Sequence, residues 1–325
     1  MKLSWSDPPS LGGSLDRLGR SVCVALIGFS GALFPMPAFA IEGGFSTRAP
    51  GSQGPLAGIL PGPGTYGTNS LYYYTGDAGR LPRNGRIELE VEVDALLDVL
   101  QVTHITSINL FGASVGFGAA LPIGYVSLES RILEPSQTFQ ADSDDFDVGD
   151  LVLTPLVLGW HSGSLHWTGS LSVVVPLGTY EASKTINVSL NRYAIDPTVG
   201  VTWLNPRTGL EVSGALGYTV SFENDETDYD SGDEVHFEAA VAQHFPSGLA
   251  LGLAGYGVWQ VTGDSGTGAV LGDFKGRAIG LGPMASYNFD VADYKFSASA
   301  RYYHEFAVAK RFEGDTSFLQ VSFKF

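Results

Sequence analysis

Four carboxylates stand at alternate positions in the run Ile87-Glu-Leu-Glu-Val-Glu-Val-Asp94. Side chains two residues apart on a strand point to the same face, about 7 Å from each other. Glu88, Glu90, Glu92 and Asp94 would therefore form one acidic stripe. In the lumen of a membrane barrel, the stripe would attract cations and repel anions. On a strand that continues beyond the membrane it would instead be a solvated extension, and both alternatives stay open.

Histidines and a carboxylate share one face of another alternating segment. His236, Glu238 and His244 have the same parity, and His236 beside Glu238 has the spacing that an acid–base pair requires. No serine stands in the strand–turn–helix pattern of an activated nucleophile. We therefore expect no enzyme activity and no catalytic residue, and we place these side chains on a polar wall.

Charged residues also fall within the alternating segment from Tyr294 to Val308. Arg301, Tyr303 and Glu305 lie on its polar face, and a charge at membrane depth is costly unless it points inward and is paired. They could line a pore, or they could only pair with one another. The candidate pore-lining residues are Glu88, Glu90, Glu92, Asp94, His166, His236, Glu238, Arg301, Tyr303 and Glu305.

Two acidic stretches, Asp142–Asp150 and Asp225–Glu234, are rich in oxygen ligands. Calcium could bind there, but neither stretch follows the EF-hand spacing, since Gly232 takes a ligand place in the register that starts at Asp228. Solvated loop acids, bridged by divalent cations to lipopolysaccharide, are the alternative. We expect no resident metal site and no cofactor.

The elements that must position these residues are strands. In Leu165–Val173 and Leu210–Phe222, apolar side chains alternate with Ser, Thr, Gly and other small residues. The polar face of a soluble sandwich usually carries Lys and Glu, whereas a membrane barrel turns apolar side chains to lipid and polar ones to its lumen. The pattern predicts an all-β fold, a transmembrane antiparallel up-and-down β-barrel.

The connections between these segments predict about twelve strands. Short connections such as Ser162-Gly163 alternate with long ones such as 179–193. Short periplasmic turns, longer outer loops and an even strand count are typical of outer-membrane barrels, so both ends of the barrel domain, residues 71–325, fall on the periplasmic side. The predicted strands are 71–77, 87–104, 108–129, 148–161, 164–178, 194–204, 209–223, 233–245, 248–262, 274–289, 294–309 and 316–325.

Residues 1–40 have the pattern of a signal peptide. Arg17 and Arg20 precede the apolar run Ser21–Phe34, which is short for a membrane helix, and Ala38-Phe-Ala40 is a cleavage pattern. We expect cleavage after Ala40 and export to the outer membrane of a diderm bacterium. The net charge of −16 argues against nucleic acid as a partner.

Residues 41–70 differ from the barrel segments because they contain 12 Gly and Pro residues. Proline cannot donate to a β-ladder and glycine weakens a strand. This segment is therefore predicted either to plug the barrel or to form a periplasmic tail.

Aromatic residues mark the borders of the predicted barrel. Trp160, Trp167 and Trp203 lie beside short turns, as expected of a periplasmic aromatic girdle. The chain ends in Val321, Phe323 and Phe325 at alternate positions. This ending is similar to the terminal strand that the barrel-assembly machinery recognises.

Five groups of short segments follow one another along the chain: Glu42–Gly44 with Ala49–Gly51, Ala57–Tyr66 and Leu71–Tyr74; Val175–Tyr180; Ile195–Thr198 with Trp203–Glu211; Glu223–His236; and Gly272–Gly276. Together they resemble the outer-membrane family named for the meta pathway of phenol degradation. Gly62 stands where that family has a further proline, and the acidic strand Glu88–Asp94 is not typical of it. The resemblance implies a barrel related to channels for hydrophobic or aromatic catabolites, while the acidic strand leaves the solute open.

We therefore expect passive uptake of small, hydrophobic or aromatic solutes. A general or cation-preferring porin is the alternative of the same class, and a structural or adhesive surface barrel is the alternative of another class. The expected partners are outer-membrane lipid, lipopolysaccharide, the barrel-assembly machinery and a small-molecule solute. The sequence leaves the oligomeric state open.

Overall fold

The computed structural model describes residues 42–78, 88–134, 137–270, 272–273 and 275–325. A short 3₁₀ helix, η1 (Glu42–Gly44), precedes the strands. The strands are β1 (Gly64–Ala78), β2 (Glu88–Leu110), β3 (Ala113–Glu134), β4 (Gln137–Val148), β5 (Leu151–Ser162), β6 (Leu165–Val175), β7 (Ala194–Leu204), β8 (Leu210–Ser221), β9 (Glu234–His244), β10 (Leu249–Gln260), β11 (Arg277–Val291), β12 (Tyr294–Ala309) and β13 (Glu313–Lys324). Within these described ranges, no helix is long and apolar enough to cross a membrane.

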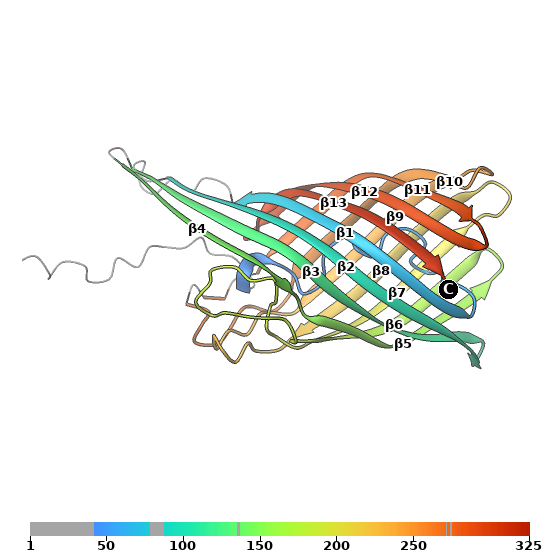
Figure 1. The fold of residues 1–325 in the computed structure, drawn as a ribbon, viewed down its shortest axis with the longest axis horizontal. Helices are drawn as coiled ribbons and strands as arrows, with labels where there is room; N and C mark the ends of the chain where they lie inside the picture. The colour runs from blue at the N-terminus through green and yellow to red at the C-terminus, as the bar shows by residue number, and fades with distance from the viewer. Residues whose placement is uncertain (1–41, 79–87, 135–136, 271, 274) are drawn as a thin grey trace, which may run out of the picture. The chain divides into compact units, whose positions relative to one another are not determined.

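The strands pair antiparallel in one ring, which closes through the pairings β1–β13 and β2–β3 (Figure 1). β3 pairs with β5 along its first part and with β4 further along, so β4 and β5 share one place in the wall and are interrupted at Gly149 and Asp150. With that place counted once, the strands build a closed twelve-stranded barrel. The predicted fold class and strand number are confirmed.

Some strand boundaries differ from those that the alternation of apolar and polar side chains predicted. β7 and β12 have the predicted bounds, but the turn between β2 and β3 lies at Phe111 and Gly112 rather than between the predicted strands 87–104 and 108–129. β2 passes an irregular register after Ile105 and continues to Leu110. Both turn residues have positive φ angles, 50° and 83°, and glycine adopts such angles at no steric cost.

Two segments predicted to lie outside strands belong to the wall. Residues 130–147 were expected to form a loop, but β3 and β4 form a hairpin there, with a ladder from Ile123↔Val148 to Glu134↔Gln137. β1 begins at Gly64 rather than near residue 71. Both segments lack a continuous apolar face, and their backbone ladders, β3 to β4 and β1 to β2 and β13, hold them in the wall without one.

The two faces of the wall have different environments. On β1, Tyr72 and Tyr74 are each 6 % exposed, whereas Tyr73 between them is 43 % exposed. The same alternation runs through the whole of β7. The exposed, outward face carries large apolar side chains such as Leu100 and Leu253, as a wall that meets lipid requires.

Candidate functional site

An irregular segment, residues 42–63, contacts the inward face of the barrel along its length; we call it the inner segment (Figure 1). At one end, Glu42 accepts hydrogen bonds from Tyr180 and Thr227, which lie in long connections between strands. At the other end, Lys324 Nζ donates to the carbonyl of Pro63 at 2.7 Å, where β13 ends near the short turns. The inner segment therefore runs from the long-loop end of the barrel to the short-turn end.

The inner segment is not part of the β-sheet, so side chains of the barrel wall accept hydrogen bonds from its backbone N–H groups. Glu238 Oε2 accepts the N–H groups of Gln53 and Gly54 at 2.9 and 3.0 Å. Glu211 Oε1 accepts the N–H of Leu56 at 2.7 Å. Both carboxylates are buried. Because a buried N–H without a partner is costly, these acceptors fix the irregular backbone against β8 and β9.

The inner segment also lies directly against β6 and β7. Thr202 accepts the N–H of Gly58 at 2.9 Å, and Thr168 donates to the carbonyl of Ala57 at 2.9 Å. A Cβ added to Gly58 would lie 2.4 Å from the backbone nitrogen of Thr202. Only glycine permits this distance between the two backbones.

Asp196 on β7 is the centre of a buried polar cluster. It accepts from Thr219 at 2.7 Å and lies 2.9 Å from His236 Nε2. Thr198 donates to its other oxygen at 2.5 Å, and Arg48 of the inner segment lies 3.7 Å away. A buried carboxylate is tolerated when it is paired and hydrogen-bonded in this way, so the cluster ties the inner segment to the wall electrostatically.

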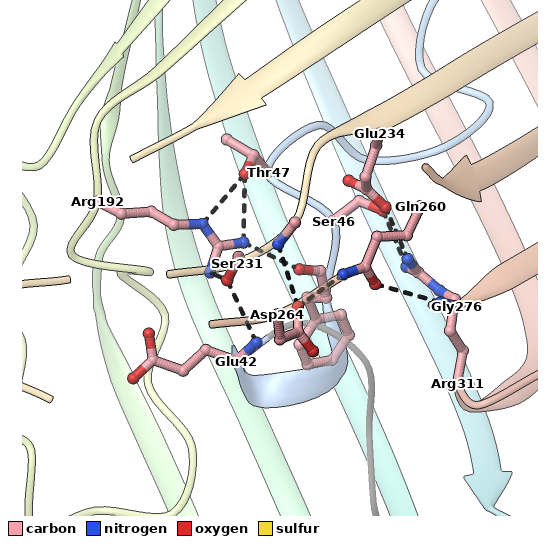
Figure 2. Close-up of polar contacts among 12 residues, drawn as sticks. Glu42, Ser46, Thr47, Arg192, Ser231, Glu234, Gln260, Asp264, Gly276 and Arg311 are labelled. Atoms are coloured by element: carbon pink, nitrogen blue, oxygen red, sulfur yellow. Dashed lines mark hydrogen bonds and ion pairs between the residues drawn. The ribbon is translucent and has the colours of Figure 1, made fainter. Parts of the chain in front are cut away.

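Two arginines from the long loops hold the first residues of the inner segment, as Figure 2 shows. Arg192, 1 % exposed, donates to Ser231 at 2.9 Å and to Thr47 at 3.2 and 3.3 Å. Arg311 forms an ion pair with Glu234 at 2.8 Å and donates to Ser46 at 2.9 Å. These contacts join three connections between strands to one stretch of the inner segment.

Tyr180 adds a neutral donor at the same end. Its hydroxyl donates to Glu42 at 3.2 Å. Burial and the negative charge of Glu42 raise the pKa of Tyr180 to about 12. The hydroxyl therefore keeps its proton at neutral pH and continues to donate to the carboxylate.

Aromatic side chains contact the inner segment from β10 and β12. Tyr303 packs edge-to-face on Tyr256, with ring centroids 5.1 Å apart, and its hydroxyl lies 3.4 Å from the carbonyl of Gly51. Glu305 accepts hydrogen bonds from Tyr256 at 2.8 Å and from Tyr74 at 3.0 Å. The rings of these tyrosines are apolar, while each of their hydroxyl groups has a hydrogen-bond partner.

The inward faces of β2 and β3 differ from those of β7–β9 because they are apolar. Val91, Val93, Val126 and Leu128 are buried in one hydrophobic cluster, which Ile186 of the β6–β7 loop also joins. We call the side chains of this cluster on β2 and β3 the apolar sector. The inward face therefore has polar residues that bind the inner segment and an apolar cluster, against which Phe45 and Ala49 of the inner segment also pack.

The structure brings most of the predicted pore-lining residues to the inward face. Glu238, His236, Tyr303 and Glu305 make the contacts described above. Arg301 lies 4.9 Å from the ring centroid of Phe318 and donates to Gln320 at 3.2 Å. His166 is the sixth predicted residue on the inward face. It lies two positions before Thr168 on β6, so both side chains point to the same side.

The acidic stripe lies elsewhere. Val91 and Val93 face inward and are 1 % exposed, so the alternate residues Glu90, Glu92 and Asp94 face outward. Arg131 on β3 lies 3.8 Å from Glu92, and Asp94 accepts from Tyr73 at 3.3 Å. This placement favours the solvated strand extension over a selectivity stripe. The side chain of Glu88 lies outside the described part of the structure.

The predicted border residues are placed as follows. Trp160 pairs with Trp167 across the β5–β6 hairpin, and Trp203 pairs with Leu165, beside the short turns and with the outward parity. Phe323 and Val321 lie near the end of β13, and the N–H of Phe325 donates to Thr65 at 2.9 Å. Ala40, the predicted cleavage position, lies outside the described residues. A girdle and an assembly signal stay predictions.

Several residues that hold the inner segment were not among the sequence candidates. Glu211 had a signal, because it alternates with Leu210 and Val212 in a strand and so lies on its polar face. No sequence pattern pointed to Arg192 or Arg311, because both lie in irregular connections and their partners are far away in the sequence.

A family model described as "Putative MetA-pathway of phenol degradation" matches residues 73–321. Among solved structures, the chain is similar to the COG4313 outer membrane channel from Pseudomonas putida F1, at 16 % sequence identity and a TM-score of 0.66, over 82 % of this chain and 97 % of that chain. It is less similar to the translocator domain of autotransporter NalP from Neisseria meningitidis, at 14 % identity and a TM-score of 0.39, over 82 % of this chain and 90 % of that chain. The TodX monoaromatic hydrocarbon channel, in a mutant form, matches at 10 % identity and a TM-score of 0.42, over 81 % of this chain and 90 % of that chain. The first likeness shows a shared fold, and the two lower scores carry no argument. No curated protein matches the chain.

Proposed function

Since the chain belongs to the phenol-degradation family whose model it matches over residues 73–321, we propose that it is an outer-membrane channel. It mediates passive uptake of small hydrophobic or aromatic solutes. The proposal includes export with cleavage after Ala40 and insertion through the terminal strand that ends at Phe325.

The observation that carries the proposal is the apolar sector inside a closed barrel. Val91, Val93, Val126 and Leu128 point inward at the long-loop half of β2 and β3. An apolar solute beside them gains about 25 cal/mol per Å² of apolar surface removed from water. A sugar or an ion would have to give up its hydration without gaining hydrogen-bond partners there.

In this proposal the inner segment is the plug that limits passage. From Gln53 to Gly58 its hydrogen bonds to the wall run to β6–β9, whereas the apolar sector lies on β2 and β3. Displacement of the segment from the apolar side would open a path without breaking the wall. A solute would then pass between an apolar surface and a polar one.

A cation-preferring porin is the second candidate, and the inward carboxylates favour it. Asp196, Glu211, Glu234 and Glu238 are all buried in the lumen. In the described structure each accepts hydrogen bonds or pairs with a cationic side chain. They would attract cations only if the inner segment left them.

Reconstitution separates these candidates. The purified protein and a variant lacking residues 42–60 are placed in liposomes, and uptake above that of protein-free liposomes is measured for a radiolabelled neutral monoaromatic solute, a pentose and potassium ions. Preferential uptake of the aromatic solute supports the first candidate, and faster potassium flux after the deletion supports the second. If a correctly folded deletion variant passes none of them, the channel proposal is wrong and a structural barrel is favoured.

A further inference from the structure

Two histidines face each other across the β5–β6 hairpin at the short-turn end of the lumen. His161 and His166 are direct partners in the strand register. Their Nδ1 atoms lie 2.8 Å apart, and their ring centroids lie 5.0 Å apart. His161 is exposed and His166 is half-buried, so ions in solution can reach the pair.

The pair lies on the inward face of the hairpin. Thr168, two residues after His166, donates to the inner segment at Ala57. Gly159, two residues before His161, lies against Leu60 of the inner segment. Because side chains two residues apart share a face, both imidazoles point into the mouth of the lumen, while Trp160 and Trp167 point to the other side.

The geometry of the two nitrogens restricts their protonation. Two Nδ1 atoms at hydrogen-bond distance share one proton, so one ring donates and the other accepts. If both rings were protonated, two positive charges would lie next to each other. When the shared proton leaves Nδ1, to solvent from a singly charged pair or to Nε2 of the same ring from a neutral pair, the two Nδ1 lone pairs converge on one point.

Convergent imidazole nitrogens are a preferred ligand set for transition-metal ions. Zinc binds histidine nitrogen at about 2.0–2.1 Å, and two such bonds in tetrahedral geometry hold the nitrogens about 3.3 Å apart. The observed 2.8 Å requires the rings to separate by only a few tenths of an ångström. The metal would take the place of the shared proton.

We propose that His161 and His166 form a binding site for a divalent transition-metal ion such as zinc, nickel or copper at the short-turn mouth of the barrel. No group of three or more metal-ligating side chains occurs among the described residues, so water completes the coordination. An open two-histidine site exchanges its metal readily. This inference does not depend on the solute that the channel passes.

The test uses isothermal titration of zinc chloride, and of nickel chloride, into the tag-free protein in detergent. We expect one bound ion per chain, with affinity reduced at least tenfold in H161A and in H166A. The matched control is H104A, since His104 lies on another hairpin and its Nδ1 bonds Thr65 at 2.9 Å. H104A should bind zinc as the unchanged protein does.

Copper quenching of tryptophan fluorescence provides a second readout, because Trp160 and Trp167 are stacked on the same hairpin at 6.2 Å. Quenching at low copper concentration should be lost in H166A but kept in H104A. If either alanine variant fails to fold, H161N or H166N serves instead. Equal binding by all variants, or no binding by the unchanged protein, would overturn the proposal.

Discussion

Gly58 and Gly62 belong to the same inner segment but have different surroundings. A Cβ on Gly58 would lie 2.4 Å from the Thr202 nitrogen, 2.6 Å from the His166 carbonyl and 2.7 Å from the Val201 carbonyl carbon, whereas a Cβ on Gly62 would meet nothing within 4 Å. G58A must therefore push the segment off β6 and β7, and G62A need not move it. We expect G58A to lower the midpoint of thermal unfolding and to raise the solute flux in liposomes, while G62A leaves both unchanged. Equal behaviour of the two variants would contradict the described contact.

Glu238 is the residue whose loss should release the middle of the inner segment. E238A removes the acceptor of two N–H groups, and each buried donor left without a partner costs about 1–3 kcal/mol. We expect a lower free energy of unfolding in urea and faster solute flux.

Two further variants make the Glu238 prediction specific. E238Q keeps a side-chain oxygen and should restore part of the stability. E92A removes an exposed carboxylate 3.8 Å from Arg131, and it should change the free energy of unfolding by less than about 1 kcal/mol. The interpretation fails if E92A destabilises the barrel as much as E238A.

At the scale of elements, the β6–β7 loop is held by two buried aspartates, Asp145 near the end of β4 and Asp150 in the β4–β5 interruption. Asp145 accepts from Lys184 at 2.7 Å and from the N–H of Val188 at 2.9 Å. Asp150 accepts from Ser189 at 2.6 Å and from the N–H of Leu190 at 2.8 Å. The end of β4 and the interruption after it therefore supply the anchors of the loop that carries Ile186 into the apolar cluster.

Loss of one anchor should expose this loop to protease. D145N removes the negative charge that binds Lys184, so trypsin added to intact cells should cleave after Lys184 faster than in the unchanged protein. The control is D144N, because Asp144 is exposed on the other face of β4. Equal cleavage of both variants would show that Asp145 does not hold the loop, and cleavage only in broken cells would place the loop in the periplasm.

At the scale of the whole molecule, closure of the ring makes the barrel one cooperative unit. The pairings β1–β13 and β2–β3 close the ring, and of the described strands β4 alone pairs on one side only, with β3. Closure of the ring therefore removes the sheet edges that could fray, except along β4. We expect the extracted protein to migrate faster on a gel before boiling than after it. A soluble periplasmic protein with the same mobility under both conditions would contradict the membrane barrel.

The sequence by itself determined the wall. β7 and β12 were predicted with their bounds because period-2 alternation runs through each, and alternation is a local property of a strand between two environments. The β3–β4 hairpin was missed because β4, rich in Asp, Ser and Gln, has no continuous apolar face. The alternation of side chains placed His236, Glu238 and Arg301 on the polar face, but it did not predict which residues they contact.

Only the tertiary structure decided those partners. His236 bonds Asp196, which is 40 residues away in the chain, and Glu238 bonds Gly54 at a separation of 184 residues. Such contacts depend on how twelve strands close around a segment without periodicity. The same is true of Glu92 and Asp94, whose alternation predicted one shared face, whereas the register of β2 in the closed ring turned that face outward. Alternation defines two faces, and only ring closure decides which of them is inside.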